Sequence, residues 1–198
     1  MKRWILVVLS SVFFINYAQG ASSLPDELGD FKLGMPIQAV ENILNSKGLQ
    51  EVSYDYRIWV GDERFPESSY SLSSSPREIR MCVHLSTASP YNYDGENWEW
   101  LIFGFYQGEL YDIQLLTYYA GQKGKEECYN SYKNEDNQLQ SLYKNFEKEA
   151  NKDEDYENRT YEYENKQLFL LYSVEEDLSS MVLLVLRDSG IDDKVNGK

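Results

Sequence analysis

Residues Trp98–Tyr119 read WEWLIFGFYQGELYDIQLLTYY. Apart from the N-terminal leader, no other segment is apolar over such a length, and its aromatic and β-branched residues are typical of strands. The short stretch Tyr106–Glu109 separates two apolar runs, so the pattern predicts a β-hairpin. We expect this hairpin to lie at the centre of a sheet around which the rest of the chain packs.

The loop of this hairpin determines which residues share a face. Gly108 adopts positive φ at no steric cost, which favours a three-residue loop with a bulge, whereas a two-residue loop at Gln107 and Gly108 would shift the register by one. The three-residue loop gives one apolar face: Leu101, Phe103, Phe105, Tyr111, Ile113 and Leu115. The other face carries Trp98, Trp100, Ile102, Tyr106, Asp112, Gln114, Leu116 and Tyr118. Either helices or loops cover this second face, or it binds a partner or ligand.

Residues 1–20 have the pattern of a signal peptide. Lys2 and Arg3 precede the apolar run Trp4–Ile15, and Ala18–Gly20 fits a small-residue cleavage site. The run is too short to span a bilayer comfortably, and no cysteine follows it for lipid attachment. We therefore expect a mature chain that begins near Ala21, is periplasmic or secreted and soluble, is not a lipoprotein, and does not insert into the membrane.

The chain is strongly acidic. Its net charge is -14, and loss of the two basic residues of the leader would make it -16. Such a chain is repelled by nucleic acid and by anionic membranes, and it attracts basic proteins. We expect a basic protein partner and no nucleic acid. The length of residues 21–198 suits a single domain with a substantial core.

The order of predicted elements indicates the fold class. Pro36 suits a first helical turn, and Ile37, Val40 and Leu44 give the helix 36–47 one apolar face. The later predictions are strands at 51–60 and 78–87, the central hairpin, a hairpin at 160–174 and a strand at 181–188. Residues 125–150 are predicted to form either one helix or, because the apolar pattern lapses at 134–137, a helix–turn–helix. Loops are expected at 61–76 and 88–97, an acidic connector at 151–158 and a frayed tail at 190–198. This order predicts an α+β fold with helices on one face of an antiparallel sheet, arranged as a degenerate α-then-β repeat of residues 31–120 and 121–190.

Two short motifs resemble a known family. The segment Gly34–Leu44, GMPIQAVENIL, resembles the first helix of the outer-membrane-assembly proteins of the SmpA/OmlA type, and Phe105–Leu110, FYQGEL, resembles a strand-turn-strand element of such domains. Those proteins share with the β-lactamase inhibitor proteins an α/β arrangement of helices on an antiparallel sheet, which the resemblance implies here. Pro36 and Asn45 depart from the family pattern, as does the missing lipid-attachment cysteine. A role in outer-membrane assembly is therefore not implied.

The cysteines and the only histidine leave little room for catalysis. Cys82 and Cys128 are either a disulfide, as is common in an oxidising compartment, or two buried thiols. His84 and Cys82 share a predicted strand face, but adjacent strand residues rarely form a nucleophile and an oriented base. One histidine and two cysteines also argue against a zinc site. We expect no enzyme activity and no cofactor.

The connector gives a weak calcium signal. Asp153, Asp155 and Glu157 lie at the spacing of a calcium loop, but Tyr156 stands where the sharp turn requires glycine. We interpret the segment as a solvated connector and keep these three carboxylates only as a weak candidate.

The loops suggest binding. Residues 61–76 and 88–97 are rich in Ser, Tyr, Asn and Gly, which is typical of binding loops and also of ordinary turns. The candidate binding residues are Tyr70, Tyr91, Tyr93, Trp98, Trp100 and Tyr106. Our leading hypothesis is a non-enzymatic protein-binding module, an inhibitor or immunity-type partner of a basic protein. The alternative is a small-ligand or glycan-binding envelope protein whose aromatic platform consists of Trp59, Trp98, Trp100 and Tyr106, with Asp112 or Gln114 fixing hydroxyl groups.

Overall fold

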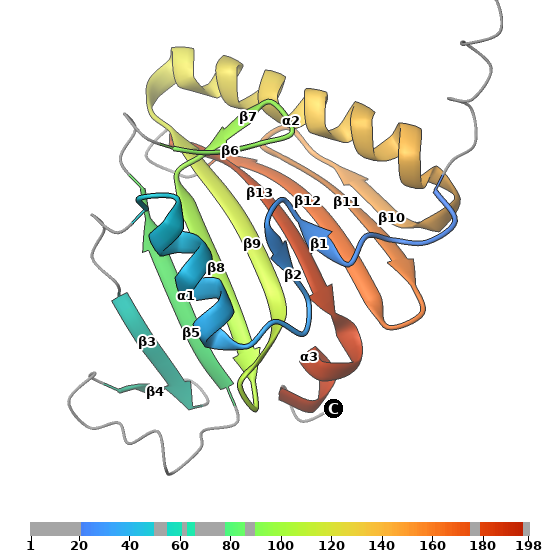
Figure 1. The fold of residues 1–198 in the computed structure, drawn as a ribbon. Coiled ribbons are helices and arrows are strands. Elements are labelled where there is room, and N and C mark those ends of the chain that lie inside the picture. The colour runs from blue at the N-terminus through green and yellow to red at the C-terminus, as the bar shows by residue number, and fades with distance from the viewer. Residues whose placement is uncertain are drawn as a thin grey trace, which may run out of the picture.

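An antiparallel sheet dominates the fold (Figure 1). The computed structural model describes residues 21–49, 55–60, 63–65, 78–85, 90–174 and 179–195. Within these residues, nine strands form the sheet, and helices α1 and α2 pack on one of its faces. The predicted α+β class with an antiparallel sheet is confirmed. The elements in chain order are β1 (Glu27–Leu28), β2 (Phe31–Lys32), α1 (Ile37–Ser46), β3 (Asp55–Val60), β4 (Glu63–Phe65), β5 (Glu78–His84), β6 (Tyr91–Tyr93), β7 (Glu96–Trp98), β8 (Trp100–Tyr106), β9 (Glu109–Tyr119), α2 (Gly121–Tyr143), a 3₁₀ turn (Lys144–Phe146), β10 (Glu147–Lys152), β11 (Tyr156–Tyr163), β12 (Lys166–Val174), β13 (Ser180–Asp188) and α3 (Ser189–Val195).

Four strands of each half follow the same order in the sheet, and β4 adds an edge strand beside β3 in the first half. The strand order runs β10-β11-β12-β13-β9-β8-β5-β3-β4. After α1, strands β3, β5, β8 and β9 are neighbours in sequence order, and after α2 strands β10 to β13 are as well. The last strand of each half meets the other at the centre, where Leu115 on β9 lies opposite Leu184 on β13. The topology is thus a helix followed by a four-stranded meander, formed twice.

The core lies between this sheet and the two long helices, on what we call the inner face. Phe103, Ile113 and Leu184 are buried there from adjacent strands, and Val40 of α1 and Tyr132 of α2 are buried against them. The apolar spacing of α1 correctly predicts its buried side, because residues three and four apart lie on one helix face.

The central hairpin has the predicted pairing but a different turn. Gln107 and Gly108 both have positive φ, 54° and 87°, and form a two-residue loop in place of the three-residue loop that we expected. A bulge between Gly104 and Phe105 then restores the expected register, so Phe103 lies opposite Ile113. A Cβ at Gly104 would lie 3.0 Å from Tyr111 Cε1, so a side chain at this position would require its neighbours to shift.

Several segments differ from the prediction. The expected loop 61–76 contains the strand β4, and the expected connector 151–158 includes the end of β10 and the start of β11. The expected loop 88–97 contains the hairpin of β6 and β7. The expected helix 125–150 is α2, which begins earlier, continues without a turn through 134–137 and ends at Tyr143; the 3₁₀ turn and the strand β10 follow it. The helix continues there because the polar residues Glu135 and Asp136 are buried, so polarity does not mark a turn. The tail contains the short helix α3.

The leader, residues 1–20, lies outside the described residues. None of the helices described is long and apolar enough to cross a membrane.

Candidate functional site

The face of the sheet opposite α1 and α2, which we call the outer face, carries mostly apolar side chains. Its first row crosses four strands, with Trp100 opposite Leu116, Leu116 opposite Leu183 and Leu183 opposite Leu171. The next row contains Ile102, Gln114, Val185 and Phe169. A third row, at the margin, contains Tyr118, Met181, Ser173 and Tyr156.

These side chains differ in exposure. Tyr118 and Tyr156 are 45% and 39% exposed, so two large aromatic rings border the face. Trp100 and Leu183 are half-buried, whereas Val185 is buried among its neighbours. The inner-face residues of the same strands are buried by α1 and α2, so the two faces of the sheet are distinct.

A buried ion-pair cluster closes one end of the outer face. The Asp112 carboxylate is fully buried and receives Arg187 Nε at 3.2 Å, Arg80 Nη1 at 3.6 Å and Gln114 Nε2 at 2.6 Å. Burial raises the pKa of Asp112, and the two guanidinium groups oppose that shift. Asp192 of α3 pairs with Arg187 at 3.6 Å, so the short helix lies at this end of the sheet.

Of the predicted binding residues that the structure describes, two reach the outer face. Trp100 and Tyr106 lie there, half-buried. Trp98 is 1% exposed and Tyr91 is 4% exposed, because the β6–β7 hairpin folds them into the core, and Tyr93 packs partly against it. The four-ring platform with Trp98 is therefore not formed. Tyr70 and the side chain of Trp59 lie outside the description.

Of the two alternatives for the cysteines, the structure has thiols and no disulfide between them. Cys82 and Cys128 are both thiols. Cys128 is buried on α2 against the inner face, whereas Cys82 lies opposite Ile102 on the outer side of β5, so the sheet separates them. Burial raises the pKa of the Cys128 thiol to about 11, which keeps it unreactive at neutral pH.

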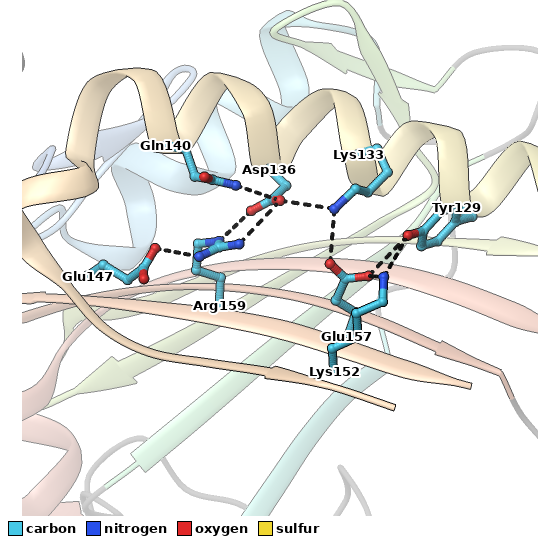
Figure 2. Close-up of polar contacts among 8 residues, drawn as sticks. All are labelled: Tyr129, Lys133, Asp136, Gln140, Glu147, Lys152, Glu157 and Arg159. Carbon is cyan, nitrogen blue, oxygen red and sulfur yellow. Dashed lines mark hydrogen bonds and ion pairs between the residues drawn. The ribbon is translucent and has the colours of Figure 1, made fainter. Parts of the chain in front are cut away.

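A network of charged groups joins α2 to β10 and β11 (Figure 2). Arg159 of β11 donates from Nε to Asp136 Oδ1 at 2.5 Å and also contacts Glu147. Lys133 Nζ lies 3.2 Å from Asp136 Oδ2 and 2.9 Å from Glu157 Oε1, linking two carboxylates. Both carboxylates are nearly inaccessible to solvent. The paired lysine and arginine compensate their negative charge, which would otherwise be costly to bury.

The second half of the network surrounds Glu157. Lys152 Nζ lies 2.7 Å from Glu157 Oε2 and 3.0 Å from the Tyr129 hydroxyl, which itself donates to Glu157 Oε2 at 3.2 Å. Burial opposes the charged form of Glu157, but hydrogen bonds from Lys152 and Lys133 outweigh it and keep its pKa below the usual value. Glu157 is thus a carboxylate held between two ammonium groups.

These contacts also decide the calcium prediction. Glu157 is paired with Lys133 and Lys152, and Asp155 lies 2.6 Å from Lys125 Nζ. No group of three or more acidic, histidine or cysteine side chains in the described part of the chain is arranged to hold a metal ion. Two of the three candidate carboxylates, Asp155 and Glu157, bind lysines, so the described geometry does not support the weak calcium candidate.

A pocket of about 720 Å³ opens beside this network, between the first turns of α2 and the turn that joins β10 to β11. Tyr129 and Tyr172 form its aromatic floor, with ring centroids 5.2 Å apart in an edge-to-face arrangement. Sequence reasoning missed this site. The only signal was the spacing of Tyr129, Lys133, Asp136 and Gln140, which places polar groups on one face of a helix.

Glu135 is another buried acidic residue that the sequence did not predict. It is 0% exposed, and neither carboxyl oxygen has a hydrogen-bond partner among the described residues. Burial, with Asp94 and Glu96 of the β6–β7 hairpin nearby, raises its pKa to about 8. The side chain is therefore largely protonated at neutral pH.

Comparison with protein-family models, with curated proteins and with solved structures finds no match for this chain.

Proposed function

We propose that this protein is a non-enzymatic protein-binding module of the cell envelope or of secretions, and that it binds its partner through the outer face of the sheet. One observation carries this proposal: the row of Trp100, Leu116, Leu183 and Leu171 is apolar across four central strands, on a face that α1 and α2 leave uncovered. Large apolar patches on a folded surface are typical of interaction sites.

The residue types on this face support protein binding. Trp, Tyr and Met are enriched in protein interfaces, and here Trp100, Met181 and the exposed Tyr118 and Tyr156 lie on or beside the apolar rows. Aromatic side chains supply much of the binding energy when a partner covers them. The ion-paired end at Asp112 supplies the polar rim that such interfaces usually have.

The charge of the chain supports a basic partner. The net charge is -14, and the acidic turn Asp153–Asp155 leads directly into the exposed Tyr156. Opposite charge on a partner raises the association rate and favours the correct orientation. An inhibitor or immunity-type partner of a basic protein fits this combination.

The first test is capture of partners from envelope extracts at low and high salt. The parent protein should retain a basic protein that a Leu171→Lys/Leu183→Lys variant loses, while a Leu142→Lys variant retains it. Leu142 is 46% exposed on α2, away from the outer face, and receives the same charge. Equal capture by all three proteins would place the site elsewhere, and capture of no protein would count against a binding module.

The acidic turn gives a kinetic prediction. Replacing Asp153 and Glu154 with Asn and Gln should slow association with the captured partner, and the parent's association rate should fall as salt rises, because exposed charges are screened beyond about 8–10 Å. Both residues are exposed, so stability should change little. Surface plasmon resonance at several salt concentrations measures this. A salt-independent rate that is equal in both proteins would remove the turn from the interface.

A further inference from the structure

In the pocket beside the charged network, the lysines are paired with acidic residues, whereas several carboxylates are not paired with a cation. Each of its lysines has an acidic partner: Lys123 lies 3.2 Å from Glu127, Lys125 lies 2.6 Å from Asp155, and Lys152 lies 2.7 Å from Glu157. The lining carboxylates Glu126, Asp153 and Glu154 form no side-chain ion pair among the described residues. The uncompensated charge at this pocket is therefore negative, which favours a cation.

The floor of the pocket already binds ammonium groups. Lys152 Nζ lies 5.4 Å from the centroid of the Tyr129 ring, and Lys133 Nζ lies 5.8 Å from it. An ammonium within about 6 Å of an aromatic ring is attracted to its face. Glu157 accepts a hydrogen bond from each of the same two lysines, so the ring and the carboxylate recognise the same chemical group (Figure 2).

The two lysines differ in how firmly they are held. Lys133 also pairs with the buried Asp136, and its side chain is 35% exposed. Lys152 ends the edge strand β10, its side chain is 64% exposed, and its acidic partner is Glu157. Its long side chain can therefore leave the site without disturbing the core, and its departure would leave the Tyr129 ring and one side of Glu157 open to the pocket.

We propose that this pocket binds a small organic cation with an alkylammonium group, which takes the place of the Lys152 ammonium on Glu157 and Tyr129. Lys152 is an intramolecular competitor whose ammonium group occupies the site when no ligand is bound. A volume of about 720 Å³ is in the range of small-molecule sites. A second ammonium on the ligand would be attracted to Glu126 and Glu154, so a diamine suits the pocket better than a monoamine.

Calorimetric titration with cadaverine, a five-carbon diamine, tests this directly. A Lys152→Met variant, which keeps the length of the side chain and removes the competing charge, should bind cadaverine at least about tenfold more tightly than the parent, because a tethered competitor reduces apparent affinity. Glutarate, a dianion of the same carbon length, should not bind. The matched control is Lys148→Met on the same strand, where Lys148 pairs with Glu162 instead, and it should behave as the parent.

Two further variants separate the pocket from a general charge effect. In the Lys152→Met background, Tyr129→Leu should weaken cadaverine binding, and Glu126→Gln with Asp153→Asn and Glu154→Gln should reduce it to the affinity of pentylamine. Thermal melting of each variant shows whether it is folded at the titration temperature. The proposal is overturned if folded Lys152→Met binds cadaverine no better than the parent does, or if glutarate binds as well as cadaverine. This result is independent of whether the outer face binds a protein.

Discussion

Replacing Glu135 with Gln is expected to raise the stability of the protein by about 4 kcal/mol at pH 8.5 and by no more than about 1 kcal/mol at pH 5. Glutamine has the shape of the protonated acid and cannot ionise. The variant therefore removes the pH dependence of this group while keeping its volume.

The direction follows from the pKa of Glu135 in the two states. The pKa is about 8 in the folded chain and near 4.5 without the fold, because burial beside Asp94 and Glu96 disfavours the charged form. Between these values the folded state keeps a proton that the unfolded state has lost. The favourable contribution is complete below pH 4.5 and is lost as pH rises through 8, so the parent becomes less stable across this interval.

Urea unfolding of both proteins at pH 5 and pH 8.5 measures the effect. The control is Glu127→Gln on the same helix, where Glu127 is 55% exposed and pairs with Lys123, and it should change stability little at either pH. A Glu135→Gln variant whose advantage over the parent does not grow between pH 5 and pH 8.5 would contradict the assignment of a buried, protonated acid.

Replacing Arg159 with Met is expected to destabilise the protein by about 3 kcal/mol, because it leaves the buried Asp136 without its closest cation. Asp136 has 1% side-chain exposure and receives Arg159 Nε at 2.5 Å. Lys133 and Gln140 remain within 3.2 and 2.8 Å of the carboxylate, so the effect should lie at the lower end of the range for a broken buried pair.

Denaturant unfolding at pH 7 measures the free energy of unfolding of each variant. A double variant tests whether the uncompensated charge of Asp136 causes the loss of stability. Arg159→Met combined with Asp136→Leu should recover part of the loss, since the uncompensated charge is gone. The surface pair of Lys148 and Glu162, 65% and 42% exposed, gives the comparison, and Lys148→Met should change stability by less than about 1 kcal/mol. An Arg159→Met variant that is as stable as Lys148→Met would mean that the network contributes nothing to the fold.

Periodicity predicts the parts of this fold whose contacts are local. The apolar spacing of α1 and the alternation in β8 and β9 identify these elements and their buried faces. The predicted register is correct although the predicted turn type is not, because the bulge before Phe105 offsets the shift that the two-residue loop would cause. A turn type depends on two φ angles, and the pattern of apolar residues does not report them.

The parts that sequence reasoning missed depend on contacts distant in sequence. Glu135 and Asp136 suggested a helix break because polar residues are usually exposed, but Asp136 is buried against Arg159 from a strand 23 residues away. Trp98 was assigned to the outer face by alternation, which ends at Glu99 because β7 and β8 are separate strands. A local sequence pattern shows neither which distant residue a buried carboxylate pairs with nor where a strand is interrupted.

The most direct test of the central claim is the affinity of the captured partner for three purified proteins: the parent, Leu171→Lys/Leu183→Lys and Leu142→Lys. If the outer face is the binding surface, the double variant should bind about 100-fold more weakly than the parent, because charges replace side chains at the centre of the apolar rows. Leu142→Lys should bind as the parent does. A double variant that is folded and binds with the affinity of the parent would contradict the account.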